Sequence, residues 1–177
     1  LKEGEQAMLA ERQKEDASPR ATRSLAGIYQ KFANLAIEQG KHHEALVHFQ
    51  NELALLQEYY GNAKRREIGK NFVNRAVPQT ELAHYPEAIA SYQKALEMVL
   101  YNYDATEKQN LPATDQFYAE NTIFEALSGM ADTYTQWAAA DANPAFLASA
   151  LDCYERSHDA EQVLRRNYLY NTSKLIN

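Results

Sequence analysis

The sequence predicts an all-α protein, on three observations. Glycine and proline, the residues that break helices, number only six and five in 177 residues. Apolar residues recur three and four positions apart, which places them on one helix face; an example is the set Ala45, Leu46, Phe49, Leu53 and Leu56. No segment alternates apolar and polar residues between turn signals, so we predict no strands.

Seven helices follow from the points where this periodicity starts and stops. They cover residues 1–15, 20–39, 42–60, 65–83, 86–104, 114–140 and 144–170. Gly40 and Gly61 follow the second and third helices, where a left-handed residue commonly ends a helix. Pro86 and Pro144 stand at predicted first helical positions, where a missing N–H is harmless. Only Pro78 falls inside a predicted helix, and we expect it to kink or shorten that helix.

Composition narrows the classes of function. The 18 Lys and Arg against 24 Asp and Glu give a formal net charge of −6, which disfavours a nucleic-acid partner. One cysteine excludes an internal disulfide, and no apolar run approaches the roughly 20 residues of a membrane span. The charged N-terminal stretch has no signal-peptide core. We therefore expect a cytoplasmic protein with no membrane partner and, because the chain lacks an initiator Met, a fragment of a longer one.

An internal repeat links two of the predicted helices. HHEALVHFQNELALLQEYYGN aligns without a gap with YPEAIASYQKALEMVLYNYDA, 43 residues later, so that Ala45 matches Ala88 and Phe49 matches Tyr92. A weaker third copy, ASALDCYERS, contains Ala150 in the matching place. Each copy follows another helix, which makes the repeating unit a helical hairpin. Such a hairpin cannot cover its own apolar face and must stack on neighbours.

The residue types of this repeat resemble the tetratricopeptide repeat, and the 43-residue spacing is similar to the kinesin-light-chain type. The resemblance assigns repeat-packing positions to small and aromatic residues: Ala33, Gly40, Ala45, Phe49, Ala76, Ala83, Ala88, Tyr92, Ala95, Ala131, Tyr134, Ala150 and Tyr154. It implies one array over 1–177, with a truncated repeat at 1–17, repeats at 20–62 and 65–105, and a divergent third repeat with an insertion at 114–170. Glu52 departs from the pattern, because it replaces the usual small residue late in the second helix of its hairpin.

The C-terminal third also resembles the repeats that precede a CHAT domain, a caspase-like peptidase, in bacterial proteins. The resemblance rests on an EAL-x-GxA helix, an AL-x-x-Y helix and an LRRxY…SK junction, here Glu125, Ala126, Leu127, Gly129, Ala131, Ala150, Leu151, Tyr154, Leu164, Arg165, Arg166, Tyr168, Ser173 and Lys174. It implies a peptidase in the parent protein and no catalytic residue in this chain.

Tetratricopeptide hairpins stack into a right-handed superhelix, and the first helix of each lines a concave groove that binds a partner segment. By register, the resemblance places ten residues in that groove: Gln30, Asn34, Ile37, Val73, Asn74, Val77, Thr80, Glu125, Ser128 and Asp132. Asn34 and Asn74 are the strongest candidates, because amides hydrogen-bond a peptide backbone of any sequence. The alternative is that all ten lie on solvated helix faces.

We therefore predict a protein-interaction module that binds a protein or peptide segment and senses or recruits it for a CHAT-type peptidase. The alternatives are a free-standing adaptor and, less favoured, an enzyme that uses Cys153. We interpret Cys153 as a small packing residue instead, because His158 is rotated away from it on a helix. The motifs of metal and phosphate sites are missing, so no cofactor and no metal are predicted. A homodimer through exposed array ends stays open.

One basic cluster consists of Lys64, Arg65, Arg66, Lys70 and Arg75. It has two interpretations, contact with an acidic peptide or neighbouring domain, or a solvated start of a helix. We favour the solvated helix start, because no aromatic residue interleaves with these basic residues.

Overall fold

The computed structural model describes residues 1–14, 19–61, 63, 65–100 and 113–175, and within them the side chains of all but 100, 113–115 and 167–175. These residues form seven helices and no strand: α1 (Lys2–Arg12), α2 (Pro19–Glu38), α3 (His42–Tyr60), α4 (Arg66–Glu81), α5 (Tyr85–Leu100), α6 (Ala113–Ala140) and α7 (Ala145–Leu175). The prediction of an all-α chain is confirmed, and each helix begins within one residue of its predicted start. The predicted helical residues 101–104 lie outside the described residues.

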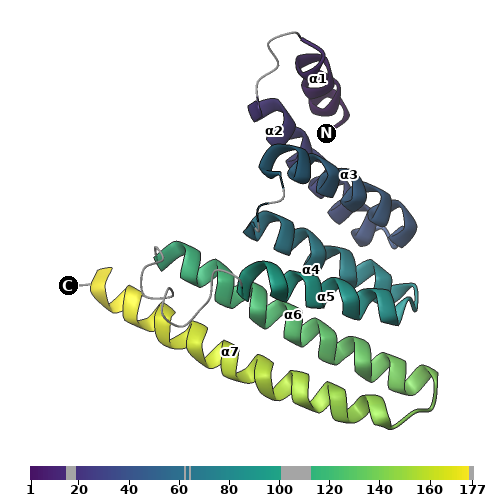
Figure 1. Cartoon of the computed structure of the whole chain (residues 1–177), viewed down its shortest axis with the longest axis vertical. Coiled ribbons are helices and arrows are strands. Elements are labelled where there is room, and N and C mark those ends of the chain that lie inside the picture. Colours follow the sequence, from purple (N-terminus) through teal and green to yellow (C-terminus); the bar gives the residue numbers. More distant parts are fainter. Residues whose placement is uncertain (15–18, 62, 64, 101–112, 176–177) are drawn as a thin grey trace.

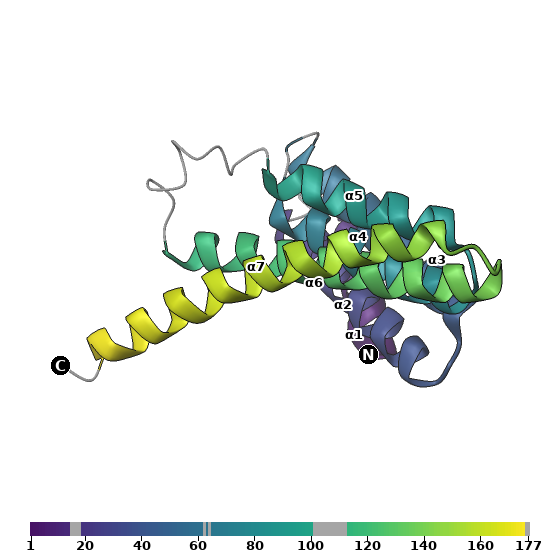
Figure 2. The ribbon, with the colours of Figure 1, turned by 90° about the horizontal axis from the view of Figure 1, so that it is seen from below.

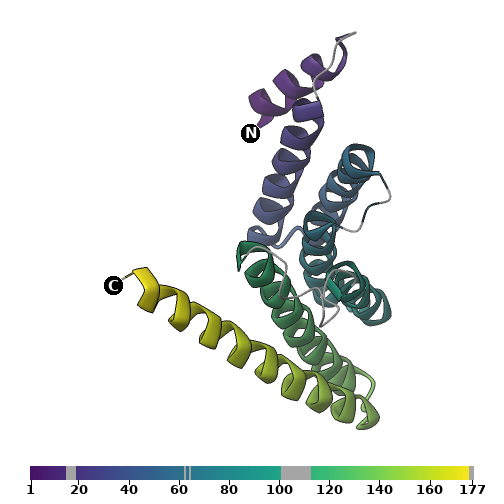
Figure 3. The same cartoon turned by 60° about the vertical axis from the view of Figure 1, so that its left-hand side comes forward.

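Six of the helices form three antiparallel hairpins, α2 with α3, α4 with α5, and α6 with α7 (Figure 1). Each hairpin packs on the next, through α3 against α4 and through α5 and α4 against α6, while α1 packs on α2. All three hairpin turns lie along the same side of the stack, on the right in Figures 1 and 2. Because each hairpin packs on its neighbours, helix α1 lies at one end of the array and α7 at the other (Figure 3).

The three hairpin turns share one backbone geometry. Gly40, Ala83 and Ala142 all have positive φ, at 69°, 58° and 49°. The N–H of the next residue then donates to a carbonyl five residues earlier, at 2.8 Å for Lys41 to Ala36 and 2.8 Å for His84 to Gln79. This is the Schellman pattern that ends many helices. The repeat places Ala83 at the position that Gly40 has in the first hairpin. Ala83 adopts the same left-handed backbone conformation, although its Cβ makes this conformation less favourable than it is for glycine.

Exchanging glycine and alanine at the turns of Gly40 and Ala83 is expected to change the free energy of unfolding in opposite directions. A Cβ in the left-handed region costs about 1 kcal/mol, so Ala83→Gly is expected to raise the free energy of unfolding by up to about 1 kcal/mol. Gly40→Ala is expected to lower it by about 1 kcal/mol, although a Cβ there would meet nothing within 4 Å. Urea denaturation measures both, and equal signs for the two variants would contradict the backbone argument.

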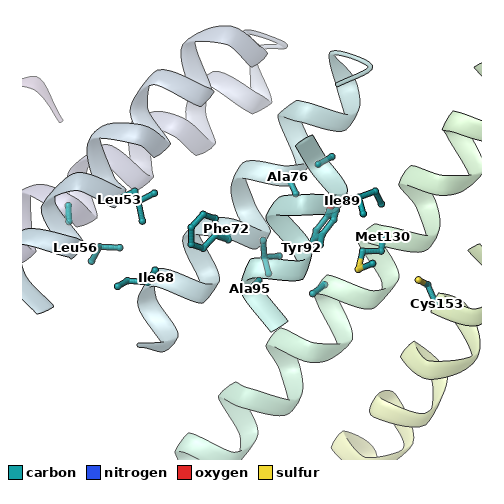
Figure 4. Packing of buried hydrophobic residues seen from close by; sticks show 14 of the residues in the cluster. Leu53, Leu56, Ile68, Phe72, Ala76, Ile89, Tyr92, Ala95, Met130 and Cys153 are labelled. Carbon is teal, nitrogen blue, oxygen red and sulfur yellow. The ribbon is translucent and has the colours of Figure 1, made fainter. Parts of the chain in front are cut away.

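The core follows the small residues of the repeat. Seven residues at repeat positions are completely buried: Ala33, Ala45, Phe49, Ala76, Ala88, Ala95 and Ala131. The small size of the alanines lets the helices of a hairpin approach closely. A larger cluster continues from Leu53 and Leu56 on α3 through Phe72 on α4 and Tyr92 on α5 to Met130 on α6 and Cys153 on α7 (Figure 4).

Helix α4 continues through Pro78 to Glu81, within two residues of its predicted end, and the proline ring itself is fully buried. One expectation about the helices needs correction. Tyr154 was expected to pack as Phe49 and Tyr92 do, but it is 42% exposed and its hydroxyl donates to Asp132 Oδ1 at 2.6 Å. The reason is its position on α7, because no described helix packs beyond α7 and only its Ala150, Cys153 and Ser157 face is buried.

Candidate binding site

A cavity of about 460 Å³ opens between the first helices of the hairpins. Helices α2, α4 and α6 form its walls, and Glu52 and Leu56 of α3 contribute to its lining. Its volume lies within the range of small-ligand pockets, about 300–1,000 Å³. The lining residues combine small, polar and charged side chains: Arg23, Ala26, Gly27, Gln30, Glu52, Leu56, Arg66, Glu67, Lys70, Tyr118, Asn121 and Thr122.

The space exists because α2 presents small residues there. Ala26 is buried against the core, and Gly27 has no side chain. A Cβ built on Gly27 would meet no atom within 4 Å, so the cavity at this point is open rather than filled by a close helix contact. The first atom of a side chain at Gly27 would therefore enter the cavity without a clash with a neighbouring helix.

A buried carboxyl group belongs to the lining. Glu52 is only 4% exposed, and Asn71, fully buried on α4, donates from Nδ2 to its Oε2 at 2.8 Å. The same amide nitrogen donates to the backbone carbonyl of Phe49 at 3.0 Å, which fixes the orientation of Asn71. Burial raises the pKa of Glu52 to about 7, and the Asn71 hydrogen bond opposes this rise. The carboxyl group is thus held in place but poorly stabilised as an anion.

Charged groups from three helices surround the cavity. Arg23 of α2 and Arg66 of α4 both lie near the Glu67 carboxylate, at 3.7 and 3.6 Å. The Arg66 guanidinium also lies over the ring of Tyr118, 4.4 Å from its centroid. Lys70 pairs with Glu125 of α6. Ion pairs therefore connect α2 with α4 through Glu67, and α4 with α6 through Lys70 and Glu125.

The ten residues predicted for the groove fall into different environments. Gln30 lines the cavity, and Glu125 forms an ion pair with Lys70, which is another lining residue. Val73 and Thr80 are buried and belong to the packing, the latter with its hydroxyl 2.8 Å from that of Thr133, so neither offers a free surface to a partner. The others are exposed or half-buried on the surfaces of α2, α4 and α6: Asn34, Ile37, Asn74, Val77, Ser128 and Asp132. The candidates Asn34 and Asn74 do not line the cavity.

Sequence reasoning missed most of the lining. Two members of the basic cluster, Arg66 and Lys70, line the cavity as well as standing at the exposed start of α4, while Arg75 donates to Gln50 at 3.1 Å. Lys64 lies outside the described residues. Aromatic rings do meet this cluster: Arg65 lies over the ring of Tyr60 at the end of α3, and Arg66 lies over Tyr118 of α6. The one signal in the sequence was Glu52, a carboxyl group where the repeat has a small residue.

The remaining candidate for chemistry is a packing residue. Cys153 is 3% exposed, and burial raises the pKa of its thiol, whereas an activated nucleophile needs a lowered pKa. Among the described residues, no group of three or more His, Cys, Asp or Glu side chains is placed to hold a metal ion. None of the described helices has the length and apolar character of a membrane span.

Comparisons with family models, curated proteins and solved structures found no match to this chain.

Proposed function

We propose that this protein is a helical-repeat interaction module of the tetratricopeptide type, which binds an extended segment of a partner protein along the face formed by α2, α4 and α6. One observation carries the proposal, the open cavity walled by these three alternate helices. In a stack of hairpins the first helices share one side, so a segment lying across them contacts several repeats at once. The proposal includes a right-handed superhelical stacking of the hairpins.

The character of the cavity supports a peptide-like ligand. Its polar lining of Gln30, Asn121 and Thr122 supplies side-chain donors and acceptors for a peptide backbone. Ala26 and Leu56 supply an apolar part for a side chain. Binding pockets commonly combine an apolar part with polar groups that orient the ligand.

A filled cavity is expected to weaken partner binding. Gly27→Leu places a side chain into the open space, and Ala90→Leu makes a matched change at an exposed position of α5. Partner retained on the immobilised chain is expected to fall at least about tenfold for Gly27→Leu, the equivalent of about 1.4 kcal/mol, and to stay unchanged for Ala90→Leu. Equal retention by both variants, with both folded by circular dichroism, would contradict binding at this face.

We further propose that the module recruits its partner for a CHAT-type peptidase. The support is the LRRxY…SK junction in α7, whose backbone is helical as far as Leu175. The full open reading frame tests this, because it is expected to encode a caspase-like His and Cys downstream. A frame without them would favour the adaptor role and leave the groove proposal intact.

A further inference from the structure

We infer that the cavity takes up a neutral amide side chain of the bound segment, a glutamine or an asparagine, whose amide hydrogen-bonds the carboxyl group of Glu52. This inference rests on the proposed function, because it specifies which side chain of the segment enters the groove. It commits to an uncharged ligand group, so a preference for a basic or an acidic side chain at the same place would contradict it.

The repeat itself does not need a carboxyl group at position 52. The equivalent position in the next hairpin, 43 residues later, is Ala95, which is completely buried. An alanine therefore satisfies the helix packing at this place. A polar group that packing does not require costs desolvation free energy, and this cost is recovered when a hydrogen-bond partner reaches the group.

The structure orients this carboxyl group and leaves one of its oxygens without a hydrogen bond. Asn71 donates from Nδ2 to the Phe49 carbonyl at 3.0 Å and to Glu52 Oε2 at 2.8 Å. Among the described residues, Asn71 is the only hydrogen-bond partner of Glu52, so Oε1 accepts no hydrogen bond from them. Glu52 also lines the cavity. The cavity wall therefore carries a fixed polar group that has hydrogen-bonding capacity left for a ligand.

Burial decides between a charged and a neutral ligand group. Glu52 is only 4% exposed, and the influences on its pKa are burial and the Asn71 hydrogen bond, with no cationic side chain of the described residues among them. A lysine or arginine beside Glu52 would require two charges to be taken out of water, and this desolvation can exceed the Coulombic gain of a buried ion pair. An acidic side chain would add a like charge. A neutral amide avoids both costs.

An amide also complements both protonation states of the carboxyl group. As a carboxylic acid, Glu52 can donate its O–H to the amide carbonyl and accept from the amide N–H, and as a carboxylate it still accepts from the N–H. The chain already contains such a pair, since an amide, that of Asn71, donates to Oε2. The apolar stem of a glutamine can contact Ala26 and Leu56, which line the same cavity.

The test uses capped tetrapeptides and the whole 177-residue chain. Acetyl-Gly-Gln-Ala-Gly-amide is titrated while amide NMR signals are followed, against probes with norleucine, lysine or glutamate in place of glutamine. The glutamine probe is expected to bind about tenfold more tightly than the norleucine probe, the equivalent of about 1.4 kcal/mol, because its side chain adds hydrogen bonds to Glu52. The lysine and glutamate probes are expected to bind more weakly than the glutamine probe. Shifts are expected at Gly27 and Thr122.

Two substitutions at position 52 separate an amide ligand from a basic one. Glu52→Gln keeps the size of the side chain and an acceptor for Asn71, and its own amide can pair with the amide of the probe. The preference for glutamine over norleucine is therefore expected to persist in Glu52→Gln and to vanish in Glu52→Met, whose thioether is only a weak acceptor. A preference for lysine that is lost in Glu52→Gln, or a glutamine preference that survives Glu52→Met, would overturn the inference.

The comparison of probes on the wild-type chain decides the inference even if Glu52→Met does not fold. Equal binding of the glutamine and norleucine probes, or no binding of any probe at millimolar concentration, would overturn it. If partner retention still depends on Gly27 while these two probes bind alike, the amide assignment fails and the groove proposal stands. If retention is insensitive to Gly27→Leu, the proposed function itself fails.

Discussion

Gly129→Ala will lower the free energy of unfolding by about 2–3 kcal/mol, because overpacking a filled core forces side chains or backbone to shift. The buried ring of Tyr92 on α5 lies directly against Gly129 on α6. A Cβ at Gly129 would lie 2.3 Å from both Cζ and Oη of Tyr92 and 2.7 Å from Cε1. Tyr92 is only 3% exposed, so a ring that turns away from the added Cβ must give up contacts that it makes in the core. Thermal or urea unfolding, followed by the fluorescence of Trp137 on the same helix, measures the loss.

A second helical glycine gives the matched control for this variant. Gly27 has no atom within 4 Å of its hypothetical Cβ, so Gly27→Ala is expected to raise stability by about 0.5–1 kcal/mol, the ordinary helix preference for alanine. In a Tyr92→Leu background the clash is removed, and Gly129→Ala is expected to become neutral or stabilising. An unchanged loss in that background would show that the cost does not come from the Tyr92 ring.

The helices were predictable because their signals are local. Gly40 and Gly61 have φ of 69° and 64° and follow the helices that they were predicted to end. Alanines of the repeat are completely buried where the periodicity placed them. The helix predicted over 65–83 already ran through Pro78, but the burial of the proline ring was not predictable, because it depends on neighbouring helices.

The cavity was not predictable because its parts are far apart in the sequence. Arg66 lies against Tyr118, which belongs to another hairpin, and Asn71 holds Glu52 across the contact between α3 and α4. Periodicity assigns each residue to a face of its own helix but does not say which face of another helix it meets. Tyr154 shows the same limit, because its exposure follows from the position of α7 at the end of the described array.

Glu52, which departs from the repeat pattern, pointed to the cavity better than the residues that match the pattern. Residues that match the pattern, such as Ala45 and Ala88, are explained by packing alone. Glu52 is not, because Ala95 satisfies the same position in the next hairpin. A buried carboxyl group that packing does not require leaves a measurable trace in the pH dependence of stability, whether or not a ligand is present.

The free energy of unfolding is expected to fall by about 2–3 kcal/mol between pH 5 and pH 8 in the wild-type chain relative to Glu52→Gln, at 1.36 kcal/mol per unit of pKa change. Burial raises the pKa of Glu52 from 4.5 to about 7, so the folded chain binds its proton more tightly than the unfolded chain. The contribution of this proton to stability is therefore complete below pH 4.5 and is lost as the pH rises through 7. Urea denaturation at several pH values measures the difference, and Glu52→Gln removes this group from the comparison while it keeps an acceptor for Asn71. Parallel stability profiles for the two chains would mean that Glu52 ionises in the folded chain as it does in the unfolded one, and its carboxylate would then already have a stabilising partner.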